Sequence, residues 1–253
     1  MLNRRELLAA SGGAAATAVA LDALTAARAA DARRQAIGFD AFTIFDPRSI
    51  VRAVDAEFPG RGEELGAAWR TKLFEYCWLR TLYRNYADFL EIADESLSVV
   101  FETAKIDLSA TTRARLIEAW RQLKPWPDSA AVLQSLHKAG FRLATVSNFT
   151  PSMLNLLCEN AGIAGLFEHQ LSADRVQAYK PDPRAYGMAE TAFRLPRHSI
   201  VFAAFGGWDA AGAKSFGLET FWVNRFNLPS ERLGAQPDAS GGSLADLASY
   251  VSR

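Results

Sequence analysis

The feature that most constrains this chain is a regular alternation of short apolar runs and amphipathic stretches in its second half. Strand-like runs lie at 141–147, 168–172, 199–204 and 219–223. Helix-like stretches occupy 128–139 and begin at Pro151, at Pro183 and near 208. Strands that alternate with helices over short loops form a parallel sheet covered on both faces. The sequence therefore predicts an α/β fold.

A separate apolar run at 36–42 predicts the first strand of that sheet. The stretch that follows it has helical spacing only, and it predicts helices at 61–86, 87–103 and 109–123. We therefore predict a Rossmann-like core domain, residues 30–48 and 124–253, and a helical cap domain, residues 49–123. The cap is inserted after the first strand and lies over the carboxyl edge of the sheet, where such sheets bind ligands.

Two helix starts are predicted from capping residues. Thr111 or Thr112 is expected to begin the third cap helix. Pro125 and Pro127 interrupt the chain after it, and Asp128 is then expected to cap the next helix with its side chain.

The N-terminus has the pattern of an export signal. Arg4 and Arg5 precede an Ala-rich apolar stretch, and Ala27-Arg28-Ala29 is a small-x-small cleavage pattern. We expect residues 1–29 to be a twin-arginine-type signal peptide and the protein to be periplasmic. The stretch is too weakly apolar for a stable membrane anchor. The alternative is an Ala-rich tail.

Composition excludes several classes of partner and cofactor. The 28 basic and 28 acidic residues balance and are scattered, so no nucleic-acid footprint is present. The three histidines show no metal-ligand spacing, so we expect no metal and no cofactor. Cys77 and Cys158 lie in helical patterns and are expected to be buried thiols.

Polar residues follow four of the five predicted strands. Asp40 ends the first strand, and the other three positions are Ser147-Asn148, Lys180-Pro181-Asp182 and Gly206-Gly207-Trp208-Asp209. Each alone fits a cap or a turn. Together they bring a carboxylate, a hydroxyl, an amine and a second carboxylate to one edge of the sheet.

These motifs and their surroundings resemble the haloacid dehalogenase superfamily, and within it the type II (L-2-haloacid) dehalogenases. The similarity runs from about Ile37 to the end of the chain. It is carried by residues 58–62, 69–70, 75–76, 78–80, 147–148, 179–182, 186, 208–209 and 222–225. The resemblance implies hydrolysis of short 2-haloacids to 2-hydroxy acids through a covalent aspartyl ester. Members of this family are often homodimers.

The resemblance also implies a role for each matching residue. Asp40 attacks the substrate, Arg70 receives the halide, and Asp209 serves the hydrolytic step. The implied catalytic set is Asp40, Thr43, Arg70, Ser147, Lys180, Tyr186 and Asp209. The implied substrate contacts are Ala41, Phe42, Phe74, Phe89, Asn148 and Trp208.

The chain departs from the family pattern at two motifs. Phe42 is followed directly by Thr43, whereas the family carries a glycine between these positions. Ala204 and Gly206 stand where the family has serine and asparagine. Gly206 therefore predicts a roomier pocket with one hydrogen-bond donor fewer.

Three alternatives remain open. The phosphatase branch of the superfamily needs an acid where Phe42 stands and a metal ligand in the motif that here reads Phe205-Gly206-Gly207. A related hydrolase that acts at carbon on another leaving group, such as the ring nitrogen of a small cyclic amino acid, keeps the same nucleophile. A non-catalytic exported binding protein is the third alternative.

Overall fold

The computed structural model describes residues 34–253 and is built on a six-stranded parallel sheet. The predicted signal peptide lies outside the described residues. The strand order is β5 (His169–Ser172), β4 (Arg142–Ser147), β1 (Ala36–Phe39), β6 (Ile200–Ala204), β7 (Glu219–Val223) and β8 (Ala239–Gly241). Every residue of β1 and β6 is buried, as expected for a parallel sheet covered on both faces. The α/β prediction is confirmed.

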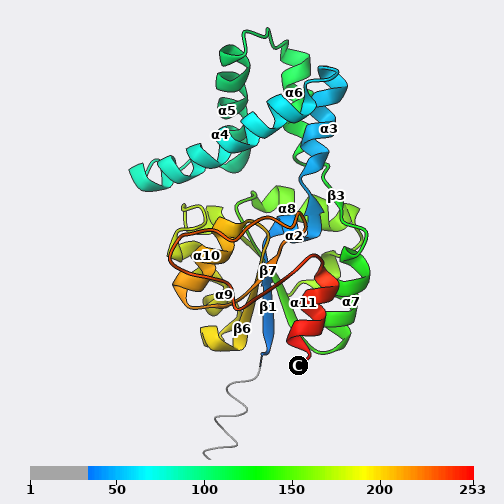
Figure 1. Cartoon of the computed structure of the whole chain (residues 1–253), viewed down its shortest axis with the longest axis vertical. Helices are drawn as coiled ribbons and strands as arrows, with labels where there is room; N and C mark the ends of the chain where they lie inside the picture. The colour runs from blue at the N-terminus through cyan, green and yellow to red at the C-terminus, as the bar shows by residue number, and fades with distance from the viewer. Residues whose placement is uncertain (1–33) are drawn as a thin grey trace, which may run out of the picture. The chain divides into compact units, whose positions relative to one another are not determined.

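Helices cover both faces of the sheet because successive strand residues point to opposite sides. In β6, Phe202 packs into one apolar cluster, while its neighbours Val201 and Ala203 pack into another. The first cluster is completed by α9 (Pro183–Phe193) and α10 (Gly207–Phe216). The second is completed by α7 (Ser129–Lys138), α8 (Pro151–Asn160) and α11 (Leu244–Val251). Figure 1 shows this layered arrangement.

A helical insert leaves and re-enters the core through a two-stranded antiparallel ribbon. The ribbon pairs β2 (Phe45–Asp46) with β3 (Lys124–Pro125). The insert contains α3 (Arg48–Glu57), α4 (Gly62–Tyr83), α5 (Phe89–Thr103) and α6 (Ala110–Ala119). It lies above the carboxyl edge of the sheet (Figure 1). The long helix α4 matches the predicted 61–86, whereas α3, β8 and α11 were not predicted.

The first strand is shorter than predicted. β1 ends at Phe39, and Ala41–Ile44 form a four-residue helix, α2, with Asp40 at its N-cap. The Asp40 carboxylate accepts from the Phe42 backbone N–H, and the Thr43 hydroxyl donates to the Asp40 carbonyl at 2.7 Å. Such local bonds compete with extended structure, so the apolar residues after Asp40 turn away from the sheet.

Two predicted helix starts also differ from the structure. Ser109, not Thr111 or Thr112, caps α6, because its hydroxyl accepts from the Thr112 N–H at 3.1 Å. Asp128 occupies the N-cap position of α7 but makes no capping bond. Its carboxylate instead pairs with Arg225 and accepts from the Leu244 N–H.

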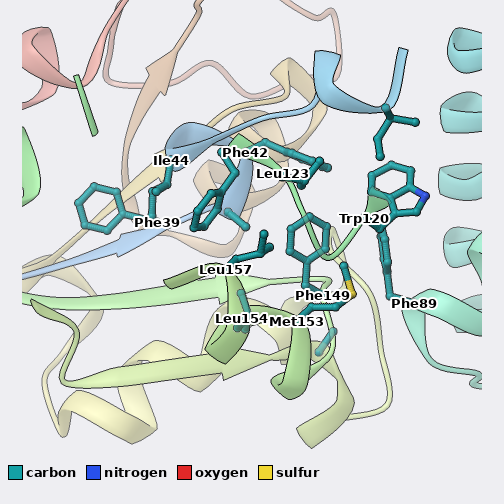
Figure 2. Packing of buried hydrophobic residues seen from close by; sticks show 14 of the residues in the cluster. Phe39, Phe42, Ile44, Phe89, Trp120, Leu123, Phe149, Met153, Leu154 and Leu157 are labelled. Carbon is teal, nitrogen blue, oxygen red and sulfur yellow. The ribbon is translucent and has the colours of Figure 1, made fainter. Parts of the chain in front are cut away.

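Aromatic rings join the insert to the core. Phe149, after β4, packs edge-on against Phe42 with ring centres 5.2 Å apart, and against Phe89 of α5 at 4.9 Å. Phe89 also contacts Trp120 at 5.2 Å. Figure 2 shows Phe149 between the core residues and the insert residues. This cluster fixes the insert against the strand end that carries Asp40.

Both cysteines are buried free thiols, as predicted. Burial raises the pKa of Cys77 and raises that of Cys158 to about 12, so both stay protonated. Within residues 34–253, no helix is long and apolar enough to cross a membrane.

We expect Phe89→Ala to lower the free energy of unfolding by about 3–5 kcal/mol, because it empties a fully buried ring position. Urea unfolding measures this directly. The control is Leu82→Ala, whose side chain is 75% exposed, and which should change stability by no more than about 0.5 kcal/mol. A Phe89→Ala protein as stable as the control would show that the cluster does not join insert to core.

Candidate active site

A buried lysine connects two carboxylates beneath the carboxyl edge of the sheet. The Lys180 ammonium lies 2.7 Å from an Asp40 oxygen and 2.8 Å from an Asp209 oxygen. Lys180 and Asp209 are each 1% exposed, and Asp40 is 7% exposed. Lys180 follows β5, Asp209 follows β6 and Asp40 follows β1, and β6 is the direct neighbour of β1. The sheet order therefore brings together three residues that are far apart in the sequence.

The pKa values of this group depend on burial and on mutual charge. Burial alone would lower the pKa of Lys180, but the carboxylates of Asp209 and Asp40 outweigh it and raise the pKa. Burial and the charge of Asp40 raise the pKa of Asp209 to about 6, although Lys180 opposes them. Lys180 is therefore charged at neutral pH, and Asp209 is an ionised carboxylate with an unusually strong affinity for a proton.

Two neighbours support this group. The Tyr186 hydroxyl, on α9, donates to Asp209 at 2.7 Å, and burial raises the pKa of Tyr186 so that it keeps its proton. The Thr43 hydroxyl donates a hydrogen bond to the Asp40 backbone carbonyl. Both residues of the implied catalytic set thus lie beside the paired carboxylates, Tyr186 next to Asp209 and Thr43 next to Asp40.

Donors for an anion lie at the end of β4, beside Asp40. The Ser147 hydroxyl accepts from the Phe149 N–H, which leaves its own proton for another acceptor. The Asn148 side-chain oxygen accepts from the Lys180 backbone N–H at 2.9 Å. That bond orients the Asn148 amide nitrogen, which is buried and has no partner among the described residues. A buried donor without a partner is costly, and a bound carboxylate would satisfy it.

A cavity of about 540 Å³ lies between this edge of the sheet and the insert. Asp40, Ser147 and Asn148 line it from the core. Arg70, on α4, lines it from the insert and makes no hydrogen bond or ion pair within residues 34–253. A concave, largely apolar cavity with a few convergent polar groups is typical of a small-molecule site.

The remaining predicted contacts divide into two groups. Phe42, Phe74 and Trp208 line the cavity together with Asn148. Ala41 and Phe89 do not line it, since both side chains are buried in the apolar core.

The cavity also has lining residues for which the sequence predicts no role. Arg48, Phe205 and Arg225 are among them. Arg225 could have been found, because it follows β7 at the same edge of the sheet. Arg48 has no such signal, because the helix that carries it was not predicted.

Gly206 does not leave the expected empty space. A Cβ atom at this position would lie 2.8 Å from the Trp208 indole nitrogen. A Cβ atom on Gly207 would lie equally close, 2.8 Å, to the Glu231 side chain. The space beside the two glycines is therefore filled by the Trp208 ring and the Glu231 side chain, and it is not open to a larger substrate.

The site lacks the acid that the phosphatase alternative requires. Phe42, two residues after Asp40, packs against the rings of Phe74, Phe149 and Phe205. In the part of the chain that the structure describes, no group of three or more His, Cys, Asp or Glu side chains is arranged to hold a metal ion.

Comparison with known proteins agrees with this geometry. A family model described as haloacid dehalogenase-like hydrolase matches residues 13–217. The chain is 40% identical over 209 residues to an (S)-2-haloacid dehalogenase of Pseudomonas sp. (strain YL), covering 82% of this chain and 90% of the relative. It is 38% identical over 205 residues to haloacetate dehalogenase H-2 of Moraxella sp. (strain B), covering 81% and 92%.

Solved structures give the same result. An L-2-haloacid dehalogenase superposes with a TM-score of 0.85 at 35% identity, over 87% of this chain and 100% of the other. The L-2-haloacid dehalogenase of Xanthobacter autotrophicus with chloropropionic acid covalently bound superposes with a TM-score of 0.80 at 31% identity, over 86% and 98%.

We expect Lys180→Met to destabilise the fold by about 3–5 kcal/mol near neutral pH, because it leaves two buried carboxylates without their cation. The pKa of Asp209, already raised to about 6, then rises further because Lys180 no longer lowers it. Stability from such groups is present below the unfolded pKa and is lost as pH rises through the folded pKa. The deficit should therefore shrink as pH falls toward about 4, where Asp209 takes up a proton.

Urea unfolding of both proteins at the two pH values checks this expectation. Lys214→Met is the control, because Lys214 pairs with Asp238 at the surface and its loss should cost only about 0–1 kcal/mol. A deficit for Lys180→Met that is the same at both pH values would contradict the assigned charges.

Proposed function

The chain belongs to the haloacid dehalogenase-like hydrolases, and we propose that it hydrolyses short (S)-2-haloacids to 2-hydroxy acids. The observation that carries this proposal is the Asp40–Lys180–Asp209 group, which lies beneath a cavity whose opposite wall presents Arg70. A carboxylate nucleophile, a cation for a departing anion and a second carboxylate for water are the three parts that the reaction needs.

In the first step, Asp40 attacks C2 of the substrate. The Lys180 ammonium pairs with the Asp40 carboxylate, and the low exposure of Asp40 limits its solvation by water. Ser147 and Asn148 hold the substrate carboxylate. A carbon–oxygen bond to Asp40 forms as the carbon–halogen bond breaks on the opposite side, so C2 is inverted. The halide leaves with the bonding electron pair toward Arg70.

In the second step, water cleaves the ester on Asp40. Asp209, with its pKa of about 6, is ionised at neutral pH and accepts a proton from the attacking water. The water oxygen adds to the ester carbonyl carbon of Asp40. The bond between the Asp40 carbonyl carbon and the product oxygen then breaks. The product oxygen takes the proton that Asp209 accepted, and the second proton of the water is released to solvent. Asp40 is again a carboxylate.

One observation favours a second candidate. Glu231 lines the cavity, packs over Gly207 and has no ion-pair partner within the described residues. A carboxylate there suits a leaving group that becomes positively charged, such as the ring nitrogen of a small cyclic amino acid. Ring opening of a four-membered cyclic amino acid without halide release from 2-haloacids would establish this candidate instead.

We further propose that residues 1–29 direct export to the periplasm. Arg4-Arg5 and the Ala27-Arg28-Ala29 pattern support this proposal. Sequencing the N-terminus of the protein from a periplasmic fraction tests it, and a retained Arg5 would contradict cleavage. A homodimer stays a prediction.

We expect halide release from the (S) enantiomer of 2-chloropropionate and none from the (R) enantiomer. With enzyme in excess in heavy-oxygen water, the first turnover should label Asp40 and leave the product oxygen unlabelled, because the product oxygen comes from Asp40. Mass spectrometry of the peptide and of the lactate measures both. Label that appears directly in the first product would contradict the ester route, and Asp40→Asn should fold but release no halide.

We expect Arg70→Lys to reduce kcat by about 10²-fold or more, because a point charge replaces the planar fork that faces the departing halide. Steady-state halide release measures the change. Arg61→Lys is the matched control, because Arg61 precedes the same helix and pairs with Glu64 at the surface. Equal turnover in the two variants would show that Arg70 does not receive the halide.

A further inference from the structure

The short helix α2, which carries Asp40 at its N-cap, cannot satisfy its own carbonyl groups. The last four carbonyls of any α-helix have no partner within the helix, and α2 contains only four residues. All four residues are buried, so water cannot readily take these bonds. The Ala41 carbonyl accepts from the Phe45 N–H, and the other three need partners from elsewhere in the chain.

Those partners come from two distant segments. The Trp126 indole N–H donates to the Phe42 carbonyl at 2.9 Å, and the Arg225 guanidinium donates to the Thr43 carbonyl at 2.8 Å. The Ile44 carbonyl accepts from the Trp126 backbone N–H at 2.9 Å and from the Ser129 hydroxyl at 2.8 Å.

Trp126 and Arg225 also fix each other. The Arg225 guanidinium lies 4.5 Å from the centre of the Trp126 ring, a cation–π distance. Asp128 holds the same guanidinium through bonds of 2.9 and 3.3 Å. The Arg225 side chain is 7% exposed, so its charge is largely removed from water and depends on these partners.

We propose that Trp126 and Arg225 are positioning residues that aim Asp40 by holding the carbonyl end of α2. The inference rests on the proposed function, because the nucleophile must point at C2. The turn after Asp40 is one residue shorter than in the family that the chain resembles. Its shape therefore depends on hydrogen bonds from other segments of the chain. Misplacing a reacting group by about 1 Å can cost about 10²-fold in rate.

The test compares two variants with matched controls. Trp126→Phe removes the indole N–H and keeps an aromatic ring, and Arg225→Lys keeps the charge and loses the fork. Trp69→Phe is the first control, because the buried Trp69 indole donates to the Ala93 carbonyl at 2.8 Å inside the insert. Arg142→Lys is the second, because Arg142 joins the Glu168 carboxylate to the Phe193 carbonyl at the other end of the sheet.

We expect each variant to lower kcat for (S)-2-chloropropionate by roughly 10- to 100-fold with KM within about twofold of wild type. The controls should lose comparable stability but keep kcat within about twofold. A rise in KM with unchanged kcat in Arg225→Lys would overturn the proposal, because Arg225 would then bind substrate directly. Equal kcat losses in variants and controls would overturn it as well, since the effect would be structural.

A measurement without substrate keeps this test separate from the proposed activity. Hydrogen exchange followed by mass spectrometry should show faster exchange in the peptide that contains residues 41–45 in Trp126→Phe and Arg225→Lys. The peptide of β4 should be unchanged in both. If wild type releases no halide but this exchange pattern appears, the proposed activity is wrong, but Trp126 and Arg225 still hold the carbonyl end of α2. Unchanged exchange at residues 41–45 would overturn the proposal that Trp126 and Arg225 hold α2, whether or not the enzyme releases halide.

Discussion

The ammonium group of Lys180, buried between Asp40 and Asp209, is the interaction on which the rest of the site depends. One positive and two negative charges share a volume that water barely reaches, so the group is stable only while all three members are present. Burial and the charge of Asp40 raise the pKa of Asp209 to about 6, although Lys180 opposes this shift. In the proposed reaction, Asp40 is the nucleophile and Asp209 is the base of this same group.

The sheet order and the insert explain how the site is assembled. β1 lies between β4 and β6, so Asp40 is flanked by the donors of Ser147-Asn148 on one side and by Asp209 on the other. Among the described core residues that line the cavity, Arg225 is the only cation, and it pairs with Asp128. Arg70 comes from α4 of the insert, and the aromatic contacts of Phe149 with Phe42 and Phe89 hold the two parts together.

Much of this could be predicted from the sequence, because strand and helix periodicity and the polar residues after each strand are local signals. The missed features depend on distant partners. α2 forms because Asp40 and Thr43 bond locally and its carbonyls find Trp126 and Arg225. Asp128 has the right residue type for a cap, but Arg225 takes its carboxylate. Gly206 suggested open space, which the ring of Trp208 fills.

The contacts at the end of α2 connect three stretches of the gene that are far apart. Residues 42–44, Trp126 and Arg225 share one set of hydrogen bonds, so a codon gained or lost between Phe42 and Thr43 moves a carbonyl away from a donor encoded much later. We therefore expect such an insertion to be tolerated only together with changes at the other two positions. Lineages that differ in the length of this loop should therefore differ at 126 and 225 as well, and exchanging the loop alone between them should yield inactive chimaeras.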